Sequence, residues 1–226
     1  VPESIPQLDV PMDKLAQMTY QETAYEVMSR FLTDFTEDEL KNCINKAYDS
    51  KFDTEKIAPL HEADGAYFLE LFHGATIAFK DMALSILPHL MTTAAKKNNV
   101  KNEIVILTAT SGDTGKAAMA GFADVPGTKI IVFYPKHGVS PIQEKQMVTQ
   151  KGANTYVVTL MMPRLQLRRC SMIMSWQQSW IRQASSFLLQ TLSTSVVLFL
   201  RSYIMYMPTH HWYAMAGSKT DRRSMW

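Results

Sequence analysis

Cysteine is nearly absent from the 226-residue sequence, which contains only Cys43 and Cys170. Two cysteines cannot form the disulfide framework of a small secreted protein, so we expect a reducing compartment, the cytoplasm. Residues 1–13 hold three prolines and three acidic residues, which argues against a secretory signal there. With 46% apolar and 19% charged residues, the composition excludes a wholly disordered or fibrous chain and allows a sizeable core.

Charge is distributed unevenly along the chain. Residues 1–159 contain 14 lysines, one arginine and 20 acidic residues, whereas residues 160–226 contain seven arginines, one lysine and one acidic residue. The second segment also holds all four tryptophans, eight of the 15 methionines and one of the nine glycines. A single protein rarely changes its residue usage so abruptly, so the two segments require separate explanations.

The first segment alternates between helix and strand patterns. Apolar spacing predicts a helix over 13–31, and a capping box at 36–39 predicts a second helix that buries Leu40, Cys43, Ile44 and Ala47. A short strand is predicted at 67–72, followed by a helix over 80–96 that is bent at Pro88. The other predicted elements are strands at 103–110, 129–134 and from 155, and helices ending at 123 and spanning 140–149. This alternation predicts an α/β fold: a parallel sheet with flanking helices and right-handed crossovers.

Two loops carry chemically informative residues. Gly112 and Gly115 follow a predicted strand and open a helix, where N–H groups can bind an anion, although an ordinary strand-to-helix turn has the same pattern. Their spacing matches neither the dinucleotide nor the P-loop fingerprint. Lys80 follows an apolar run, and a lysine at a helix start is ordinarily a solvated surface residue. Apolar surroundings near a helix N-terminus would disfavour its charged form, which suits an amine that forms a Schiff base.

Both loops lie within motifs of a known family. The run LFHGATIAFKD at 71–81 resembles the pyridoxal-phosphate lysine motif of the threonine synthase family, and ATSGDTG at 109–115 resembles its second signature. YPK at 134–136 and GVSPIQEKQM at 138–147 fit the family as well. The match covers residues 1–158 and implies a partial cofactor domain of the fold-type II pyridoxal-phosphate enzymes. It also implies that the chain begins a few tens of residues inside the family domain.

The resemblance implies a reaction and a set of site residues. Lys80 would hold pyridoxal 5′-phosphate and then move protons while O-phospho-L-homoserine and water become L-threonine and phosphate. Asp113 would contact the cofactor, at a position where other fold-type II enzymes usually have asparagine. The substrate side would be formed by Thr110, Ser111, Gly112, Thr114 and Gly115. No metal is expected.

The second segment is interpreted as the same gene read in another frame. Suitable codons for Ser195–His210, read one base earlier, encode IGRLVPQIVYYVYAYA, which resembles the continuation of the family sequence. The same shift converts Leu160–Leu165 into DDAQT. We infer a deletion, not a multiple of three bases, just before Thr159. No domain and no coherent core are therefore expected over 159–226.

Two other interpretations of the second segment stay open. Residues 183–200 are uncharged and long enough to be tested as a membrane span, but they include many polar side chains. Arg164, Arg168 and Arg169 could form a nucleic-acid patch, but the arginines have no regular period. We therefore expect a small-molecule substrate, with neither membrane nor nucleic acid as partner, and assign no oligomeric state.

Two alternatives to an active threonine synthase also stay open. One is a non-catalytic fragment with a membrane- or partner-binding tail, and the other is a related pyridoxal-phosphate lyase that acts on serine or threonine. The resemblance places the family's loop for the cofactor phosphate after Trp226. The expectation for this chain is therefore an inactive truncated product.

Overall fold

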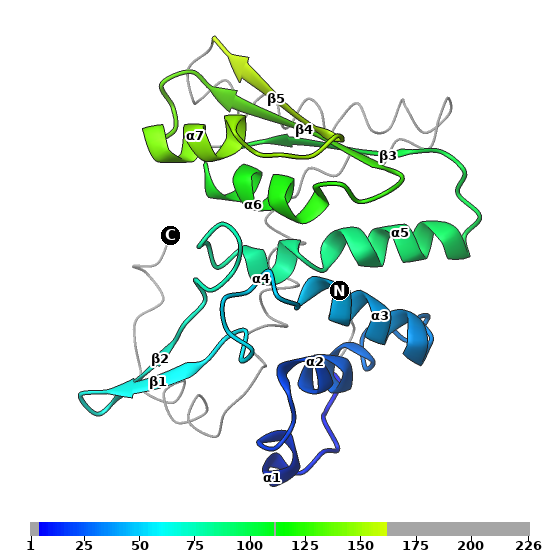
Figure 1. Cartoon of the computed structure of the whole chain (residues 1–226). Coiled ribbons are helices and arrows are strands. Elements are labelled where there is room, and N and C mark those ends of the chain that lie inside the picture. Colours follow the sequence, from blue (N-terminus) through cyan, green and yellow to red (C-terminus); the bar gives the residue numbers. More distant parts are fainter. Residues whose placement is uncertain (1–4, 111, 162–226) are drawn as a thin grey trace.

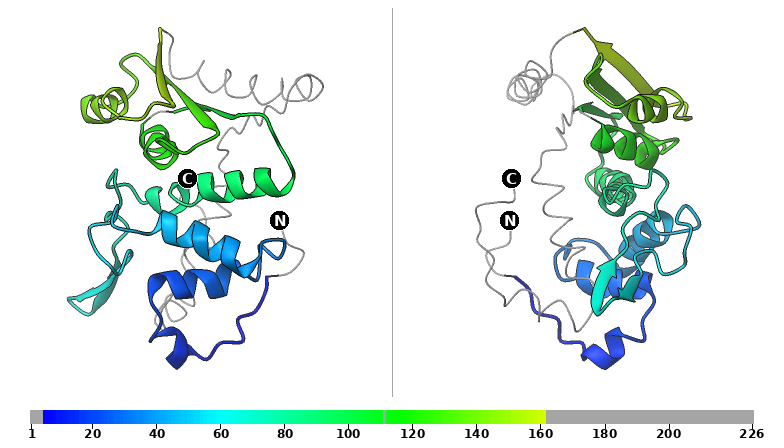
Figure 2. Two further views of the ribbon diagram at one scale, coloured as in Figure 1. Left: turned by 45° about the vertical axis from the view of Figure 1, so that its right-hand side comes forward. Right: turned by 90° about the vertical axis from the view of Figure 1, so that its left-hand side faces the viewer.

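The computed structural model describes residues 5–110 and 112–161, which form an α/β structure (Figure 1). A parallel sheet with its helices occupies one end, and a group of helices occupies the other. α4 (Asp81–Leu84) and α5 (Leu87–Lys97) lie between them in all views (Figures 1 and 2). Ser111 and every feature predicted over residues 162–226 lie outside the described residues.

Two helices replace the single helix predicted over 13–31, so that prediction was wrong. α1 (Met12–Leu15) ends before α2 (Tyr20–Met28) begins. Thr19 caps α2 reciprocally: its hydroxyl accepts a bond from the Glu22 N–H, and the Glu22 carboxylate accepts one from the Thr19 N–H. An N-cap residue needs extended backbone, so this capping box interrupts the helical spacing.

α3 (Glu37–Ala47) confirms the second predicted helix. A capping box of Thr36 and Glu39 opens it, and the four residues expected to face inward are buried. They pack with α2 and with Phe52 to form the first hydrophobic cluster. The Tyr48 hydroxyl donates a bond of 2.8 Å to the Met82 carbonyl, which ties this cluster to α4.

An antiparallel hairpin takes the place of the single strand predicted at 67–72. β1 (Leu60–Ala63) pairs with β2 (Ala66–Leu69). The two turn residues, Asp64 and Gly65, both have positive φ, at 51° and 72°, as type I′ turns require. The strand therefore ends before Phe72, and residues 70–80 form the connection that leads to Lys80.

The helix predicted over 80–96 is divided into α4 and α5. The predicted bend at Pro88 was wrong, because Pro88 lies in the first turn of α5, where a missing N–H costs no helical hydrogen bond. Met82 belongs to the first hydrophobic cluster, and Leu84 and Leu87 belong to the second. The α4–α5 segment thus joins the two cores.

A three-stranded parallel sheet confirms the predicted fold class. β3 (Ile104–Ala109), β4 (Thr128–Pro135) and β5 (Thr155–Leu160) lie in that order, and both pairs are parallel. α6 (Asp113–Phe122) and α7 (Pro141–Val148) connect them. Alternate side chains of β3 and β4 are buried against α6 and form the second cluster. Figure 1 shows α6 between the sheet and α4.

β5 continues two residues beyond Val158, where the family resemblance stops. Thr159 lies opposite Tyr134 in the ladder, and its hydroxyl donates a bond of 2.8 Å to the Tyr134 hydroxyl. The Lys136 N–H donates to the Leu160 carbonyl at 2.9 Å. Such ladder bonds use backbone groups that every residue except proline carries, so they do not depend on which side chains are encoded here.

Candidate active site

Lys80 is the residue immediately before α4. Its backbone is helical, and its carbonyl accepts bonds from the N–H groups of Ala83 and Leu84 at 3.1 and 2.9 Å. The side chain is half-buried, and its ammonium lies 5.0 Å from the centre of the Phe79 ring. The backbone of Lys80 is therefore fixed by the first turn of α4, while part of its apolar surroundings comes from the neighbouring ring.

A buried carboxylate closes the turn that precedes Lys80. Asp81 is only 3% exposed, and its two oxygens accept the Thr76 N–H at 2.7 Å and the Thr76 hydroxyl at 2.5 Å. Gly74 leaves the space for this carboxylate, because a Cβ at residue 74 would lie 2.5 Å from the Asp81 Cβ. Buried charged groups require such hydrogen bonds. The glycine, threonine and aspartate of the motif therefore build one turn.

The same turn holds a strained residue. Ile77 has a φ of 60°, which a β-branched side chain rarely adopts, and it is 71% exposed. Its N–H donates to the Gly74 carbonyl at 3.0 Å. Strain of this kind persists only where the surrounding bonds fix the backbone. The bonds between Thr76 and Asp81 are the ones that do so here.

The second predicted loop is organised by the Thr110 hydroxyl. Thr110 is buried, and its Oγ1 accepts the N–H groups of Gly112 and Gly115, both at 3.0 Å. These two N–H groups are therefore used inside the loop. Asp113 and Thr114 occupy the first turn of α6, where N–H groups have no carbonyl partner within the helix. Among the described residues of this loop, Asp113 and Thr114 thus carry backbone donors that face no carbonyl within the helix.

Asp113 lies among three polar partners. Its Oδ1 accepts a bond of 2.8 Å from the Gln143 amide and lies 3.3 Å from the Lys116 ammonium. The Gln143 bond, with smaller contributions from Lys116 and the charge of Lys80, lowers the pKa of Asp113 despite its partial desolvation. The carboxylate is therefore ionised at neutral pH and within electrostatic reach of Lys80.

A close helix contact brings the two loops together. Gly121 of α6 faces the end of α4, and a Cβ at residue 121 would lie 2.2 Å from the Leu84 carbonyl oxygen. Only glycine allows the two backbones to approach this closely. The contact holds the start of α6, with Asp113, on the same side as Lys80.

The structure assigns different positions to the residues predicted for the site. It brings Asp113 near Lys80, with Gly112, Thr114 and Gly115 at the same end of α6. It turns the Thr110 hydroxyl inward, into the loop's own bonds. Neither Asp81 nor Gln143 is predicted individually as a site residue, although they lie inside the motifs at 71–81 and 138–147. Their partners, Thr76 and Asp113, are visible only in the folded chain.

His73 links the segment before Lys80 to two carboxylates. Its Nδ1 lies 2.5 Å from Asp53 and its Nε2 lies 2.9 Å from Glu70. The bond to Glu70, followed by that to Asp53, raises the pKa of His73 in spite of partial desolvation. The His73 ring thus connects the end of the hairpin to the loop that follows α3.

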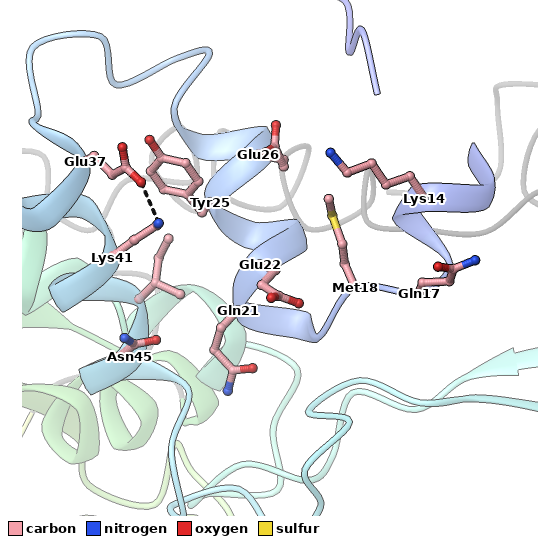
Figure 3. A pocket seen from close by; sticks show the side chains of 11 residues that line it. Lys14, Gln17, Met18, Gln21, Glu22, Tyr25, Glu26, Glu37, Lys41 and Asn45 are labelled. Carbon is pink, nitrogen blue, oxygen red and sulfur yellow. Dashed lines mark hydrogen bonds and ion pairs between the residues drawn. The ribbon is translucent and has the colours of Figure 1, made fainter. Parts of the chain in front are cut away.

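A hollow in the described part of the chain lies away from these loops. It measures about 560 Å³ between α1, α2 and α3, and none of the predicted site residues lines it (Figure 3). Its wall includes the ion pair of Glu37 and Lys41, at 2.5 Å, beside Tyr25.

In residues 5–110 and 112–161, no group of three His, Cys, Asp or Glu side chains is placed to hold a metal ion. No helix among those residues is long and apolar enough to cross a membrane.

Comparison with known protein sequences finds a consistent set of relatives. Residues 1–48 match the family model described as threonine synthase N terminus. Threonine synthase of Schizosaccharomyces pombe is 36% identical over 170 residues, which cover 71% of this chain and 33% of that protein. Threonine synthase of Pseudomonas aeruginosa is 34% identical over 165 residues, with 71% and 34% covered. The chain spans about a third of the length of these relatives.

Comparison with solved structures finds the same fold. Yeast threonine synthase superposes with a TM-score of 0.72 at 25% identity, covering 96% of this chain and 44% of that one. The pyridoxal-phosphate-bound threonine synthase of Brucella melitensis gives a TM-score of 0.74 at 24% identity, covering 92% and 46%. The arrangement is thus that of the fold-type II pyridoxal-phosphate enzymes.

Proposed function

Because the chain belongs to the threonine synthase family, we propose that it carries the cofactor lysine of the reaction that converts O-phospho-L-homoserine and water to L-threonine and phosphate. The observation that carries this proposal is the placement of Lys80 on the turn closed by Asp81, on the side of the molecule where α6 begins. Asp81 and Asp113 lie 32 residues apart in sequence, and their two motifs thereby contribute to one region.

The residues present fit pyridoxal 5′-phosphate in their donor chemistry. Lys80 supplies a primary amine, and the first-turn N–H groups of Asp113 and Thr114 supply donors for an oxygen of the cofactor or of a substrate carboxylate. The bound cofactor would draw electrons from the bonds at the substrate's α carbon. Lys80 would hold and move the proton at that carbon and its neighbour. Asp113 would face the cofactor, and Thr110, Ser111, Gly112, Thr114 and Gly115 would form the substrate side.

Reductive trapping tests the proposal. The 226-residue chain is incubated with pyridoxal 5′-phosphate, treated with borohydride, and digested for mass spectrometry of every lysine. We expect Lys80 to be modified ahead of Lys116 and Lys136, and Lys80→Arg to remove that modification. Lys97→Arg, at an ion pair with Glu39 far along α5, is the matched control. Equal modification of all accessible lysines would refute the assignment of Lys80.

The substrate is tested by protection of Lys80. A substrate that takes the place of the lysine amine on the cofactor lowers reductive labelling at Lys80. We expect O-phospho-L-homoserine to protect more strongly than serine or threonine at equal concentration. Stronger protection by serine or threonine would instead indicate a related lyase of the same fold.

We also propose that residues 159–226 are read out of frame, and that the protein acts in the cytoplasm. The abrupt change in arginine, tryptophan and methionine usage supports the first proposal. The scarcity of cysteine, with Cys43 buried and unpaired, supports the second. Sequencing of the coding DNA tests the first: an uninterrupted family reading frame through residue 226 would refute it. Fluorescent tagging of the chain in its own cell tests the second.

A further inference from the structure

Gln143 makes more bonds than its helix requires. At the start of α7, its Oε1 accepts the Ser140 N–H at 3.1 Å, and its own N–H donates to the Ser140 hydroxyl at 3.3 Å. This is a capping box, in which a glutamate serves as well as a glutamine because only an acceptor is needed. The cap therefore does not explain why an amide stands at residue 143.

The amide nitrogen of Gln143 reaches the other predicted loop. It donates to the Asp113 Oδ1 at 2.8 Å, across 30 residues of sequence. The side chain also covers Gly112, since a Cβ at residue 112 would lie 2.5 Å from both the Gln143 Cδ and Nε2. Gly112 has a φ of 143°, which favours glycine. One side chain of α7 thus contacts two consecutive residues at the start of α6.

The charges around Asp113 require a hydrogen-bond donor, and not an acceptor, at residue 143. Lys116 approaches the same oxygen of Asp113, and Lys80 contributes from the opposite loop. The bond from Gln143 is the largest cause of the lowered pKa of Asp113. A donor at residue 143 therefore holds an ionised acceptor at residue 113, whereas an acceptor at residue 143 would repel it.

We propose that Gln143 is a positioning residue of the cofactor site: its amide fixes the Asp113 carboxylate and the turn at Gly112 in the orientation that faces Lys80. This inference rests on the proposed function, because the orientation matters through Lys80 and its cofactor. Residues 113 and 143 act as a matched donor and acceptor pair. Either residue can be the donor, provided that the other is the acceptor.

Four versions of the full chain test the pair: wild type, Gln143→Glu, Asp113→Asn, and the double variant. Glutamate at 143 keeps the capping box and removes the donor. Asparagine at 113 keeps an acceptor for Gln143. The double variant restores the bond with reversed polarity, since the asparagine amide can donate to the glutamate. Gln150→Glu, just after α7, is the control for the added negative charge, because the Gln150 side chain donates only to the Lys151 carbonyl among the bonds described.

The first readout is the rate of reductive labelling of Lys80 by pyridoxal 5′-phosphate. We expect Gln143→Glu to lower this rate about tenfold, the effect of losing one hydrogen bond to a charged group. Gln150→Glu should change it by less than about threefold. The double variant should label faster than Gln143→Glu and return close to the rate of Asp113→Asn, whatever that single variant itself loses. A Gln143→Glu rate equal to wild type, or a double variant slower than Gln143→Glu, would overturn the proposal.

The second readout is hydrogen exchange of the Gly112 and Gly115 amides without cofactor. Exchange should accelerate in Gln143→Glu and recover in the double variant. If the wild-type chain shows no preferred labelling at Lys80, the proposed function fails. Hydrogen exchange alone then tests whether the bond between Gln143 and Asp113 fixes the turn at Gly112. Unchanged exchange in Gln143→Glu would then refute the positioning role of Gln143.

Discussion

The two turns around Lys80 and Asp113 are stabilised by different kinds of acceptor. The turn at 74–81 is closed by the buried Asp81 carboxylate, which accepts two bonds from Thr76. The turn at 110–115 is closed by the neutral Thr110 hydroxyl, which accepts two N–H groups. Hydrogen bonds to a charged acceptor contribute more than those to a neutral one, and their loss leaves a costlier defect. We therefore expect the first turn to be the more sensitive to mutation.

Asp81→Ala should give the largest effect, because it removes two charge-assisted bonds and leaves the Thr76 N–H and hydroxyl unpaired in the interior. We expect a loss of about 3 kcal/mol in the free energy of unfolding, measured by urea denaturation. Thr76→Ser keeps both donors and serves as the control, with a loss below about 1 kcal/mol. Equal losses in the two variants would contradict the role given to the carboxylate.

Gly121→Ala tests the contact that brings the two turns together. A methyl group 2.2 Å from the Leu84 carbonyl forces α6 away from α4, and we expect a loss of about 2 kcal/mol. Reductive labelling of Lys80 should change as well, since the start of α6 would move. The control is Ala120→Gly in the same helix, which costs about 1 kcal/mol through helix propensity alone. If the Gly121→Ala variant is more stable than the wild type, α6 and α4 do not approach each other closely at this residue.

Thr110→Val should have a smaller effect than Asp81→Ala. The valine fills the same space but offers no acceptor to the N–H groups of Gly112 and Gly115, so we expect a loss of about 1–2 kcal/mol. Thr110→Ser retains the hydroxyl and should restore most of the amide protection measured by hydrogen exchange. If Thr110→Val is as damaging as Asp81→Ala, the charge of the acceptor does not distinguish the two turns.

The smallest effect is the pH dependence due to His73. Its pKa is raised in the folded chain, so its contribution to stability is fully present below the unfolded value of about 6.5 and is lost as pH rises through the raised value. His73→Gln should remove this dependence, which begins near the unfolded value of about 6.5 and extends above it. Urea midpoints across that range measure it, and His61→Gln, in β1, is the control. If the wild-type urea midpoint rises with pH in this range and the His73→Gln midpoint does not, His73 destabilises the folded chain at low pH, which is the opposite of the expected effect.

Part of this architecture could be predicted from the sequence. The parallel sheet, the helices after β3 and β4, and the buried face of α3 follow from periodicity, which depends only on residues close in sequence. The first helix was predicted too long because the spacing of apolar residues outweighed the Thr19–Glu22 cap. The hairpin was missed although Asp64 and Gly65 form a turn signal, because its first strand has no clear alternation. These errors concern local competition between signals.

The sequence by itself determined which residues are special, and the tertiary structure decided what they do to one another. The two motifs identify Lys80 and Asp113 through resemblance, and the change in composition after residue 159 divides the chain in two. No local pattern predicts that Gln143 donates a hydrogen bond to Asp113 or that the Leu84 carbonyl lies close to Gly121. These contacts join residues about 30 or more positions apart, and only the packing of α6 against both α4 and α7 brings them together.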